Sequence, residues 1–409
     1  MVKVAILGFG TVGQGVAEVL SMNAEGIAAR SGTEITVKYI LDIRDFPESP
    51  FADRVIHDFD IIANDPEVEI VVETIGGQRF AYPYTVKALS AGKSVITSNK
   101  ELVAERGEEL LALARANGVN YLFEAAVGGG IPLIRPLMQC LSANEVTDIT
   151  GILNGTTNYI LTRMKTAGVS FADALKEAQA NGYAEADPTA DIEGHDACRK
   201  ICILADLSYG HKISPAAVYT EGITGLSAQD MHFADQAGYA VKLLGRVQRR
   251  ADGRVNILVA PHLVPGDRMI ANVNDVFNGI SVRGNAVDEV VFYGRGAGKL
   301  PTASAVVADV IDAAKNRGID RSARWVDDAP DFANNANDMI YRHYVRLSGC
   351  TALQVTKQFP DAVLVSESAQ CVEFTTAPEK TGEVLAKLDM LSAEGAHRQS
   401  LLRILDEMN

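Results

Sequence analysis

The N-terminal third of the chain alternates short apolar runs with stretches whose apolar residues recur at helical spacing. Val2–Leu7 predicts a buried strand, and four valines and leucines between positions 12 and 20 predict a helix after it. Further strands are predicted at 35–41, 68–73, 93–97 and 119–125, with helices at 83–92 and 101–117. This alternation predicts a Rossmann-type, doubly wound parallel sheet with right-handed crossovers.

The pattern changes near residue 130, where the apolar runs become longer. Residues 129–301 mix helical spacing with extended runs such as 255–265, which predicts a central α+β domain. The spacing of 302–316 predicts a strong helix, which we expect to pack back on residues 1–128 and complete the first domain.

A polar stretch separates the C-terminal part from the rest. Residues 317–338 are rich in Asp, Asn and Pro and predict a linker. Residues 339–409 then show a strand, a short helix, two strands, an amphipathic helix and an ambiguous last segment. That order predicts a small βαββαβ module.

Composition narrows the class of protein. A chain of 409 residues with 47% apolar and 22% charged residues is typical of two or three globular domains. The net charge of -14 argues against nucleic-acid or anionic-lipid partners. No apolar run reaches the length of about 18 residues that a membrane-spanning helix needs. No signal peptide is evident. Because five scattered cysteines do not form a disulfide framework, we expect a cytoplasmic protein without a membrane partner.

A glycine-rich turn directly follows the first strand. Gly8, Gly10 and Gly13, with Thr11 and Val12 between the last two, form a GxGxxG pattern that opens a helix. The glycines permit a tight turn and close approach of a pyrophosphate, which the helix N-terminus attracts. A purely structural turn is the alternative, but the position in a strand–helix–strand pattern favours NAD or NADP.

The residues after the second strand leave the choice of dinucleotide open. Asp42 could accept hydrogen bonds from the adenosine ribose, as NAD-binding domains require. Arg44 could instead meet the 2′-phosphate of NADP. A solvated loop of mixed charge is the third interpretation.

An acidic loop over 181–191 leads into a helix whose second half is apolar on every side, which predicts a buried helix. Asp196 and Lys200 lie four residues apart and share one face of it. An exposed ion pair is the alternative, but the apolar stripe that continues beyond Lys200 favours a partly dehydrated site. A lysine there can titrate low enough for acid/base catalysis. Carbonyl reduction needs such a proton donor at the oxygen while hydride arrives at the carbon.

Two further positions are candidates for the same chemistry. Lys100 follows a strand at its C-terminal end, where ligands of doubly wound sheets bind, although loop lysines are commonly solvated. Gly155 and Thr156 stand in a turn that begins a helix. Free backbone N–H groups there suit a substrate carboxylate, and helix capping alone is the alternative.

Together these segments resemble the homoserine dehydrogenases. The resemblance is carried by LNGTTNYIL at 153–161, the GY-x-E-x-DP-x-x-D-x-x-G-x-D-x-x-x-K run at 182–200, the Asn-Lys pair at 99–100, EAAVGGGIP at 124–132 and GRGAGKLPTASAVVADVI at 294–311. It implies NAD(P)-dependent interconversion of L-homoserine and L-aspartate 4-semialdehyde, in threonine and methionine biosynthesis.

The resemblance also implies roles for individual residues. Lys200 would be the proton donor and acceptor, with Asp196 orienting it. Lys100 would contact both the cofactor and the substrate oxygen. Glu185 would bind the ammonium group of the substrate, and Asp191 would line the same pocket.

A turn that faces the nicotinamide and an ion site follow from the resemblance alone. Gly296 would approach the nicotinamide end of the cofactor. A monovalent cation such as sodium would bind Glu124 and the backbone carbonyls of Val127, Gly129 and Ile131, oxygen ligands of the kind that a hard cation prefers. A glycine-rich hinge is the simpler interpretation of these residues.

The tail resembles an ACT-type ligand-binding module, although SGCT at 348–351 replaces the usual acidic-x-Pro-Gly turn. The resemblance implies either a threonine effector site or a module that only pairs subunits. It also implies a homodimer or homotetramer that shares a sheet of the central domain.

A dinucleotide-sensing regulatory protein without catalysis is the competing hypothesis. Such a protein would keep the glycine loop, lack a buried acid and lysine set, and carry a basic surface for its partner. The net charge of -14 and the segment 185–200 both favour the enzyme.

Overall fold

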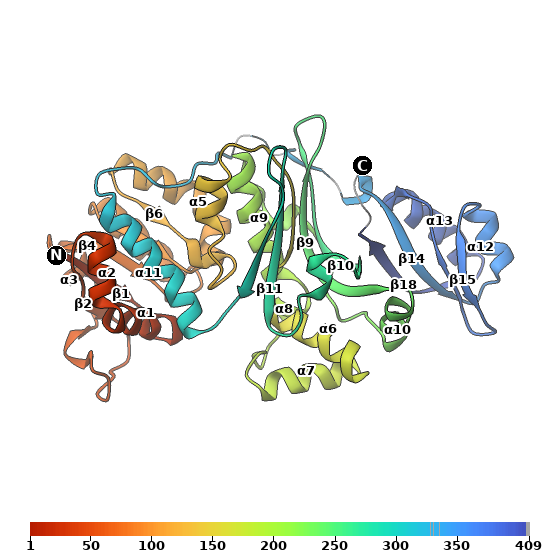
Figure 1. The fold of residues 1–409 in the computed structure, drawn as a ribbon, viewed down its shortest axis with the longest axis horizontal. Helices are drawn as coiled ribbons and strands as arrows, with labels where there is room; N and C mark the ends of the chain where they lie inside the picture. The colour runs from red at the N-terminus through yellow and green to blue at the C-terminus, as the bar shows by residue number, and fades with distance from the viewer. Residues whose placement is uncertain (328, 330, 335, 406–409) are drawn as a thin grey trace.

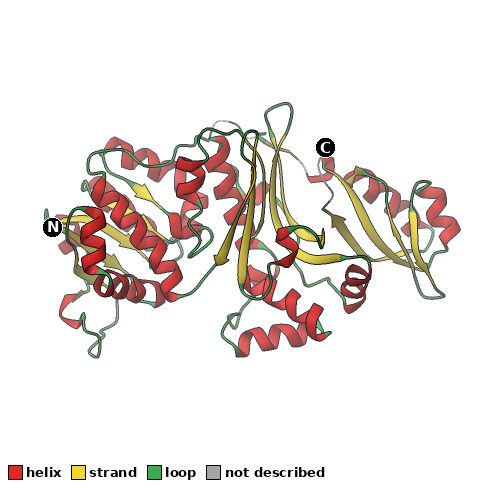
Figure 2. Cartoon of the chain, viewed as in Figure 1, coloured by secondary structure: helices red, strands yellow, loops and turns green. Residues whose placement is uncertain are grey.

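The computed structural model describes residues 1–327, 329, 331–334 and 336–405, and its parts lie in a row from the N-terminal sheet to the tail (Figure 1). Residues 328, 330 and 335 of the predicted linker and 406–409 of the predicted tail module lie outside the described residues. Helices and strands alternate in the first part, and long strands dominate the rest (Figure 2).

The N-terminal sheet is fully parallel and has the strand order β3-β2-β1-β4-β5-β6. This order reverses between β1 and β4, which creates a crevice at the carboxyl ends of these two strands. The sheet confirms the predicted Rossmann-type fold. Its strands are β1 (Val2–Leu7), β2 (Ile35–Leu41), β3 (Val55–Ile56), β4 (Val68–Glu73), β5 (Ser94–Thr97) and β6 (Tyr121–Leu122).

Helices cover both faces of this sheet, and one of them comes from far along the chain. Helix α11 packs against α1 so closely that a Cβ on Gly15 would lie 2.8 Å from the carbonyl oxygen of Lys299. The helices of this part are α1 (Thr11–Met22), α2 (Ala24–Ser31), α3 (Phe59–Asn64), α4 (Ala81–Ser90), α5 (Lys100–Ala116) and α11 (Lys299–Lys315).

The second sheet runs without interruption through the centre of the molecule and into the tail, in the order β12-β11-β7-β9-β10-β18-β14-β16-β15. Helices α6, α9 and α10 pack against its central strands. Its central part comprises β7 (Val146–Ile152), α6 (Gly155–Ala167), α7 (Phe171–Ala180), α8 (Thr189–Ile192), α9 (His195–Tyr209), β8 (Tyr219–Thr220), α10 (Ala228–Gln236), β9 (Tyr239–Arg249), β10 (Val255–Pro265), β11 (Phe277–Gly284), β12 (Asp288–Arg295) and β13 (Ala333–Asn334).

The tail joins this sheet through its last strand. The ambiguous last segment is strand β18, which pairs in parallel with β10 and antiparallel with β14. The elements of the tail are β14 (Ile340–Ser348), α12 (Ala352–Gln358), β15 (Val363–Glu367), β16 (Val372–Thr375), β17 (Glu379–Lys380), α13 (Thr381–Ala393) and β18 (His397–Ile404).

The described part of 317–338 lies on the first domain. The Asn120 side chain donates to the Ile319 carbonyl, and its Oδ1 accepts the N–H of Arg321. Trp325 is 2% exposed and meets Phe123 edge to face, with 5.7 Å between the ring centroids. This polar segment is therefore ordered by packing that its composition does not reveal.

Helix α11 begins at Lys299 and not at 302, so Pro301 lies in its first turn, where a proline is tolerated. Two further predicted boundaries are wrong for local reasons. The strand predicted at 119–125 is limited to Tyr121–Leu122, because the chain turns at Phe123 into a short 3-10 segment, Glu124–Ala126. The helix predicted to begin at Pro83 begins two residues earlier, at Ala81, so the proline lies inside its first turn, where its missing N–H costs no helical hydrogen bond. Among the described helices, none is both long and apolar enough to cross a membrane.

The packing of Trp325 generates a prediction at Gly107. A Cβ at this position of α5 would lie 2.4 Å from Cζ2 of Trp325, so Gly107→Ala must displace the indole. We expect a loss of about 1–3 kcal/mol in the free energy of unfolding, because overpacking outweighs the gain in helix propensity. Denaturant titration followed by fluorescence measures it, and the emission of this single tryptophan should shift to the red.

Gly26→Ala in α2 is the matched control. A Cβ there would meet only the flexible end of Arg30, at 3.1 Å. This variant should gain up to about 1 kcal/mol from helix propensity. Equal effects of the two substitutions would contradict the packing argument.

Candidate active site

Helix α9 presents an acid and a base inside the protein. Gly194, with a φ of 82°, lets the chain turn into this helix, and the helix is anchored by fully buried apolar residues such as Ile201 and Leu204. The side chains of Asp196 and Lys200 are only 5% and 10% exposed. Lys200 Nζ donates to Asp196 Oδ2 at 2.7 Å and to the Leu153 carbonyl at 2.8 Å. The predicted partly dehydrated pair is therefore present.

A second lysine reaches the same carboxylate from the other domain. Asn99 caps α5 by accepting the N–H of Leu102, and this fixes Lys100 at the first turn of the helix, beyond the carboxyl end of β5. Lys100 Nζ lies 2.6 Å from Asp196 Oδ1, in an ion pair that joins α5 to α9. The two oxygens of one carboxylate thus face two ammonium groups.

The environments of the two lysines differ. Burial lowers the pKa of Lys200 below its usual range. The negative charge of Asp196 opposes this effect, and the positive charge of Lys100 adds to it. Burial also disfavours the charge on Lys100, but Asp196 outweighs it and raises the pKa of that amine. The two lysines hold the pKa of Asp196 well below its usual range, against its burial. Of the two amines, Lys200 releases its proton more readily.

An asparagine that the sequence analysis did not single out completes this cluster. Asn154 Nδ2 donates to Asp191 Oδ1 at 2.7 Å and to Asp196 Oδ2 at 2.8 Å. Burial and the nearby Asp196 raise the pKa of Asp191. Asn154 also caps α6, which is a local contact, but no local pattern indicates its contacts with Asp191 and Asp196, about 40 positions away.

The other predicted substrate residues lie around this cluster in different settings. Thr156 Oγ1 donates to the Tyr183 carbonyl at 2.7 Å, which ties the start of α6 to the acidic loop. A Cβ on Gly155 would lie 2.7 Å from the Val276 carbonyl, so only glycine fits there. Glu185 is exposed, and within the described residues no ion pair joins its carboxylate to Lys100 or Lys200.

The glycine turn has the shape that a dinucleotide requires. Gly8 has a φ of 85°, and a Cβ on Gly13 would lie 2.0 Å from the Gly8 carbonyl oxygen. A Cβ on Gly10 would meet nothing within 4 Å, so the backbone is open on that side. Helix α1, which begins at Thr11 and Val12, has no side-chain cap, and this leaves its first N–H groups for an anion. The residues fit a pyrophosphate.

Asp42 and Arg44 contact each other beside this turn. Asp42 Oδ2 accepts the Phe9 N–H at 2.7 Å, and Arg44 Nε donates to Asp42 Oδ1 at 3.0 Å. Burial raises the pKa of Asp42, but these hydrogen bonds outweigh it and lower the pKa to about 2. Asp42 is therefore ionised and held against the turn, while Arg44 remains exposed.

The hinge between the two sheets is built around Glu124. Its buried carboxylate accepts the backbone N–H groups of Leu133, Ile134 and Arg135 at 2.6–2.9 Å. Gly128 and Gly129 of the hinge turn with positive φ, and a Cβ on Gly129 would lie 2.2 Å from the carbonyl oxygen of Gly296. The predicted ion loop and the predicted nicotinamide-facing turn are thus in direct contact.

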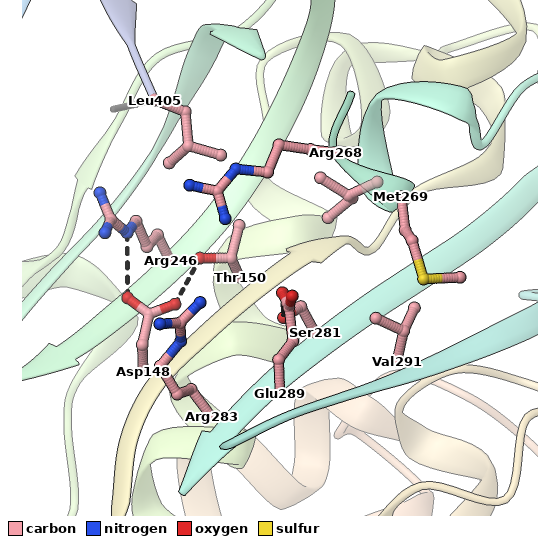
Figure 3. Close-up of a pocket in the computed structure, with 11 residues that line it drawn as sticks. Asp148, Thr150, Arg246, Arg268, Met269, Ser281, Arg283, Glu289, Val291 and Leu405 are labelled. Atoms are coloured by element: carbon pink, nitrogen blue, oxygen red, sulfur yellow. Dashed lines mark hydrogen bonds and ion pairs between the residues drawn. The ribbon is translucent and has the colours of Figure 1, made fainter. Parts of the chain in front are cut away.

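A separate pocket on the central sheet is lined by five charged side chains together with polar and apolar ones (Figure 3). Arg246 of β9 and Asp148 of β7 form a buried ion pair at 3.1 Å, and Thr150 donates to the same carboxylate at 2.7 Å. The cavity measures about 50 Å³, which holds little more than one water molecule. We interpret it as a structural ion-pair network, distinct from the lysine cluster. Among the described residues, no group of three or more His, Cys, Asp or Glu side chains could hold a metal ion.

A Rossmann-type domain with a turn shaped for a pyrophosphate, joined to a buried lysine–carboxylate pair, defines a nicotinamide-dependent oxidoreductase acting on a CH–OH group. Family models agree with this class. Residues 8–124 match the NAD-binding domain of homoserine dehydrogenase, and residues 132–311 match the homoserine dehydrogenase family. The chain belongs to the homoserine dehydrogenase family.

Individual relatives support the same assignment. A homoserine dehydrogenase of Pseudomonas aeruginosa is 48% identical over 312 residues, which cover 76% of this chain and 72% of that protein. The crystal structure of a homoserine dehydrogenase from Thiobacillus denitrificans superimposes with a TM-score of 0.93 at 36% identity, over 99% of this chain and 98% of that chain. A hyperthermophilic archaeal homoserine dehydrogenase in complex with NADPH matches 76% of this chain and 97% of its own, with a TM-score of 0.65 and 30% identity. The alternative of a regulator without catalysis is not favoured.

The shared carboxylate generates a stability prediction. Asp196→Ala leaves two ammonium groups facing each other, one of them buried, so we expect the free energy of unfolding to fall by about 3 kcal/mol. Chemical denaturation measures this loss. The control is Glu145→Ala, which removes the partner of Arg249 from an exposed ion pair and should change stability by less than about 1 kcal/mol. A loss for Asp196→Ala as small as that of the control would contradict the view that Asp196 compensates both charges.

Proposed function

We propose that this homoserine dehydrogenase interconverts L-homoserine and L-aspartate 4-semialdehyde, in threonine and methionine biosynthesis, with Lys200 as the acid/base group. The observation that carries this proposal is the single buried carboxylate shared by two lysines in different environments. One amine that stays charged and one that changes its protonation state are the two groups that alcohol oxidation and carbonyl reduction need.

The bound dinucleotide supplies the hydride acceptor or donor. Lys200, when neutral, takes the hydroxyl proton of homoserine, and its ammonium form returns a proton to the carbonyl oxygen in the reverse direction. Lys100 remains charged, would contact the cofactor when it is bound, and stabilises negative charge on the substrate oxygen. Asp196 orients both amines and balances their charge.

Substrate binding is assigned to the residues around this cluster. Asp191 and Glu185 would attract the substrate ammonium group, and Asp191 already lies beside Asn154. The backbone N–H groups of Gly155 and Thr156, at the start of α6, would receive the substrate carboxylate.

The cofactor would lie along the glycine turn formed by Gly8, Gly10 and Gly13. Its phosphates would lie at the start of α1, beside the backbone of Thr11 and Val12. Asp42, ionised and fixed, suits the ribose hydroxyls of NAD, and Arg44 would meet the 2′-phosphate of NADP by leaving Asp42. Gly296 would face the nicotinamide end. Both NAD and NADP are therefore compatible with this surface.

We also propose a monovalent cation, such as sodium, at the hinge. Glu124 would supply a carboxylate oxygen, and Val127, Gly129 and Ile131 would supply backbone carbonyls. The carboxylate is already fixed by three N–H donors, so it would reach the ion only through its remaining lone pairs. The cation would stabilise the hinge and take no part in the chemistry.

The proposed organisation has four parts. Residues 1–128, completed by 302–316, form the dinucleotide-binding domain, and residues 129–301 form the substrate and oligomerisation domain. Residues 317–338 link these to an ACT-like module over 339–409. We propose a cytoplasmic homodimer or homotetramer.

The outermost strand of the central sheet supports this assembly. Strand β12 pairs only with β11, which leaves its other edge without a partner among the described residues. It also exposes 58% of Tyr293. A second copy could extend the central sheet at this edge.

The proton role of Lys200 is tested by turnover. Purified protein is mixed with NAD(P)+ and homoserine, and absorbance of the reduced cofactor is followed. Lys200→Ala should lose most of its turnover while dinucleotide binding survives. Oxidation needs the neutral amine of Lys200, so the rate of the parent enzyme should rise with pH. It should reach half its maximum at a pH below 10.5, the ordinary pKa of a lysine. Turnover of Lys200→Ala at the parent rate would contradict the assignment.

Threonine sensing by the tail is a second candidate function, favoured by one observation. A cavity of about 450 Å³ lies between the tail and the central domain. Two arginines, Arg398 and Arg403, and two glutamates, Glu193 and Glu221, are among the residues that line it. This balance of charges suits a molecule that carries both an ammonium group and a carboxylate.

L-threonine should therefore inhibit the parent enzyme in a titration at fixed homoserine. Arg398→Ala, which removes an exposed guanidinium from the cavity wall, should require at least about 10-fold more threonine, the effect of losing about 1.4 kcal/mol of binding. Lys357→Ala, on the exposed side of α12, is the control for loss of a tail charge and should behave like the parent. A parent enzyme that does not respond to threonine contradicts this second function.

A further inference from the structure

The junction of β7 and α6 contacts both acidic residues of the lysine cluster. Leu153 and Asn154 are adjacent in the chain, and the backbone carbonyl of Leu153 and the side chain of Asn154 both face the site. The Leu153 carbonyl accepts a hydrogen bond from Lys200 Nζ at 2.8 Å. The Asn154 amide nitrogen donates to Asp191 and to Asp196. Two neighbouring residues therefore hold the proton-carrying amine and the two carboxylates near it.

The orientation of the Asn154 amide is determined by its other end. Its Oδ1 accepts the N–H of Thr157 at 2.9 Å, which caps α6, and also the Thr157 hydroxyl at 3.1 Å. A flipped amide would place its oxygen against two carboxylates and its nitrogen against an N–H donor. Only one orientation is compatible with these neighbours, so both N–H groups must face the carboxylates.

Without this amide, the buried carboxylate of Asp196 and the half-buried carboxylate of Asp191 would face each other without a shared donor. Asp191 and Asp196 each accept one N–H of the same NH2 group, at 2.7 and 2.8 Å. Asp196 Oδ2 also accepts from Lys200, while its Oδ1 faces Lys100. The amide thus fixes which oxygen of Asp196 serves which lysine.

We propose that Asn154 is a positioning residue for the reaction, which holds Asp196 so that Lys200 and Lys100 keep separate oxygens and separate roles. This inference rests on the proposed role of Lys200. Asn154 acts on the proton-carrying amine through Asp196 and through its neighbour Leu153, without contact to the reacting atoms.

Four groups face the Lys200 amine, and they determine the sign of the expected change. They are Asp196 on α9, Lys100 on α5, Asp191 on α8 and the Leu153 carbonyl. The Asn154 N–H groups withdraw negative charge from both carboxylates. When this donor is removed, the carboxylates attract the ammonium form more strongly, and the pKa of Lys200 should rise.

The decisive variant is Asn154→Ser. A serine still accepts the Thr157 N–H and caps α6, but it is too short to bridge the two carboxylates. We expect kcat for homoserine oxidation to fall by about 10- to 100-fold, the usual cost of losing a hydrogen-bond partner that orients a functional group. The pH at which the rate is half maximal should move to higher pH. KM for the dinucleotide should not change, because the glycine turn is untouched.

Two further variants separate positioning from folding. Asn154→Asp keeps an N-cap but adds a third carboxylate, so it should move the pH profile further in the same direction, and it replaces the serine variant if that one fails to fold. Ser170→Ala removes the cap of the neighbouring α7 without touching the cluster, and its kcat and pH profile should match the parent.

The possible outcomes distinguish a failure of the positioning role of Asn154 from a failure of the proton role of Lys200. If Lys200→Ala is inactive while Asn154→Ser and Asn154→Asp show the parent kcat and pH profile, the positioning role is wrong and the proposed function stands. A fall in kcat that is equal at every pH, with an unshifted profile, shows a merely structural role and also overturns the inference. If Lys200→Ala keeps the parent rate, the proposed proton role fails first, and the role of Asn154 fails with it.

Discussion

The site depends on one buried carboxylate that compensates two positive charges from different parts of the chain. Lys100 and Lys200 would repel each other across this small distance, and burying either of them alone would be costly. Asp196 makes the arrangement stable because each of its oxygens faces one amine. With Asp191 close by, the cluster holds two positive and two negative groups.

The same compensation explains why the two domains must meet at this position. Lys100 is placed by the end of β5 and the cap of α5, which belong to the parallel sheet. Asp196 and Lys200 are placed by α9, whose apolar residues belong to the core of the central sheet. Neither domain can complete the site alone. The crevice at the β1–β4 switch point and the lysine cluster are therefore joined by an electrostatic contact as well as by the hinge at Glu124.

How much could be predicted from the sequence depends on how local each feature is. The glycine turn and the Asp196–Lys200 pair could be predicted, because their spacing within one strand–helix unit determines their geometry. The bridging role of Asn154 could not, since its capping contact is local but its carboxylate contacts join segments brought together by folding. The ordered packing of Trp325 and the pairing of β18 with β10 could not be predicted for the same reason. Composition describes a segment, and it does not describe the surface on which that segment packs.

The pairing of β18 with β10 has a consequence for how the molecule comes apart. A tail attached only by a flexible linker would melt independently, as a separate cooperative unit. Here the last strand of the chain lies inside a sheet between β10 and β14, so its backbone amides belong to both the centre and the tail. Loss of these final residues would open the central sheet at an interior position, and the two regions are coupled in unfolding although more than a hundred residues separate their paired strands.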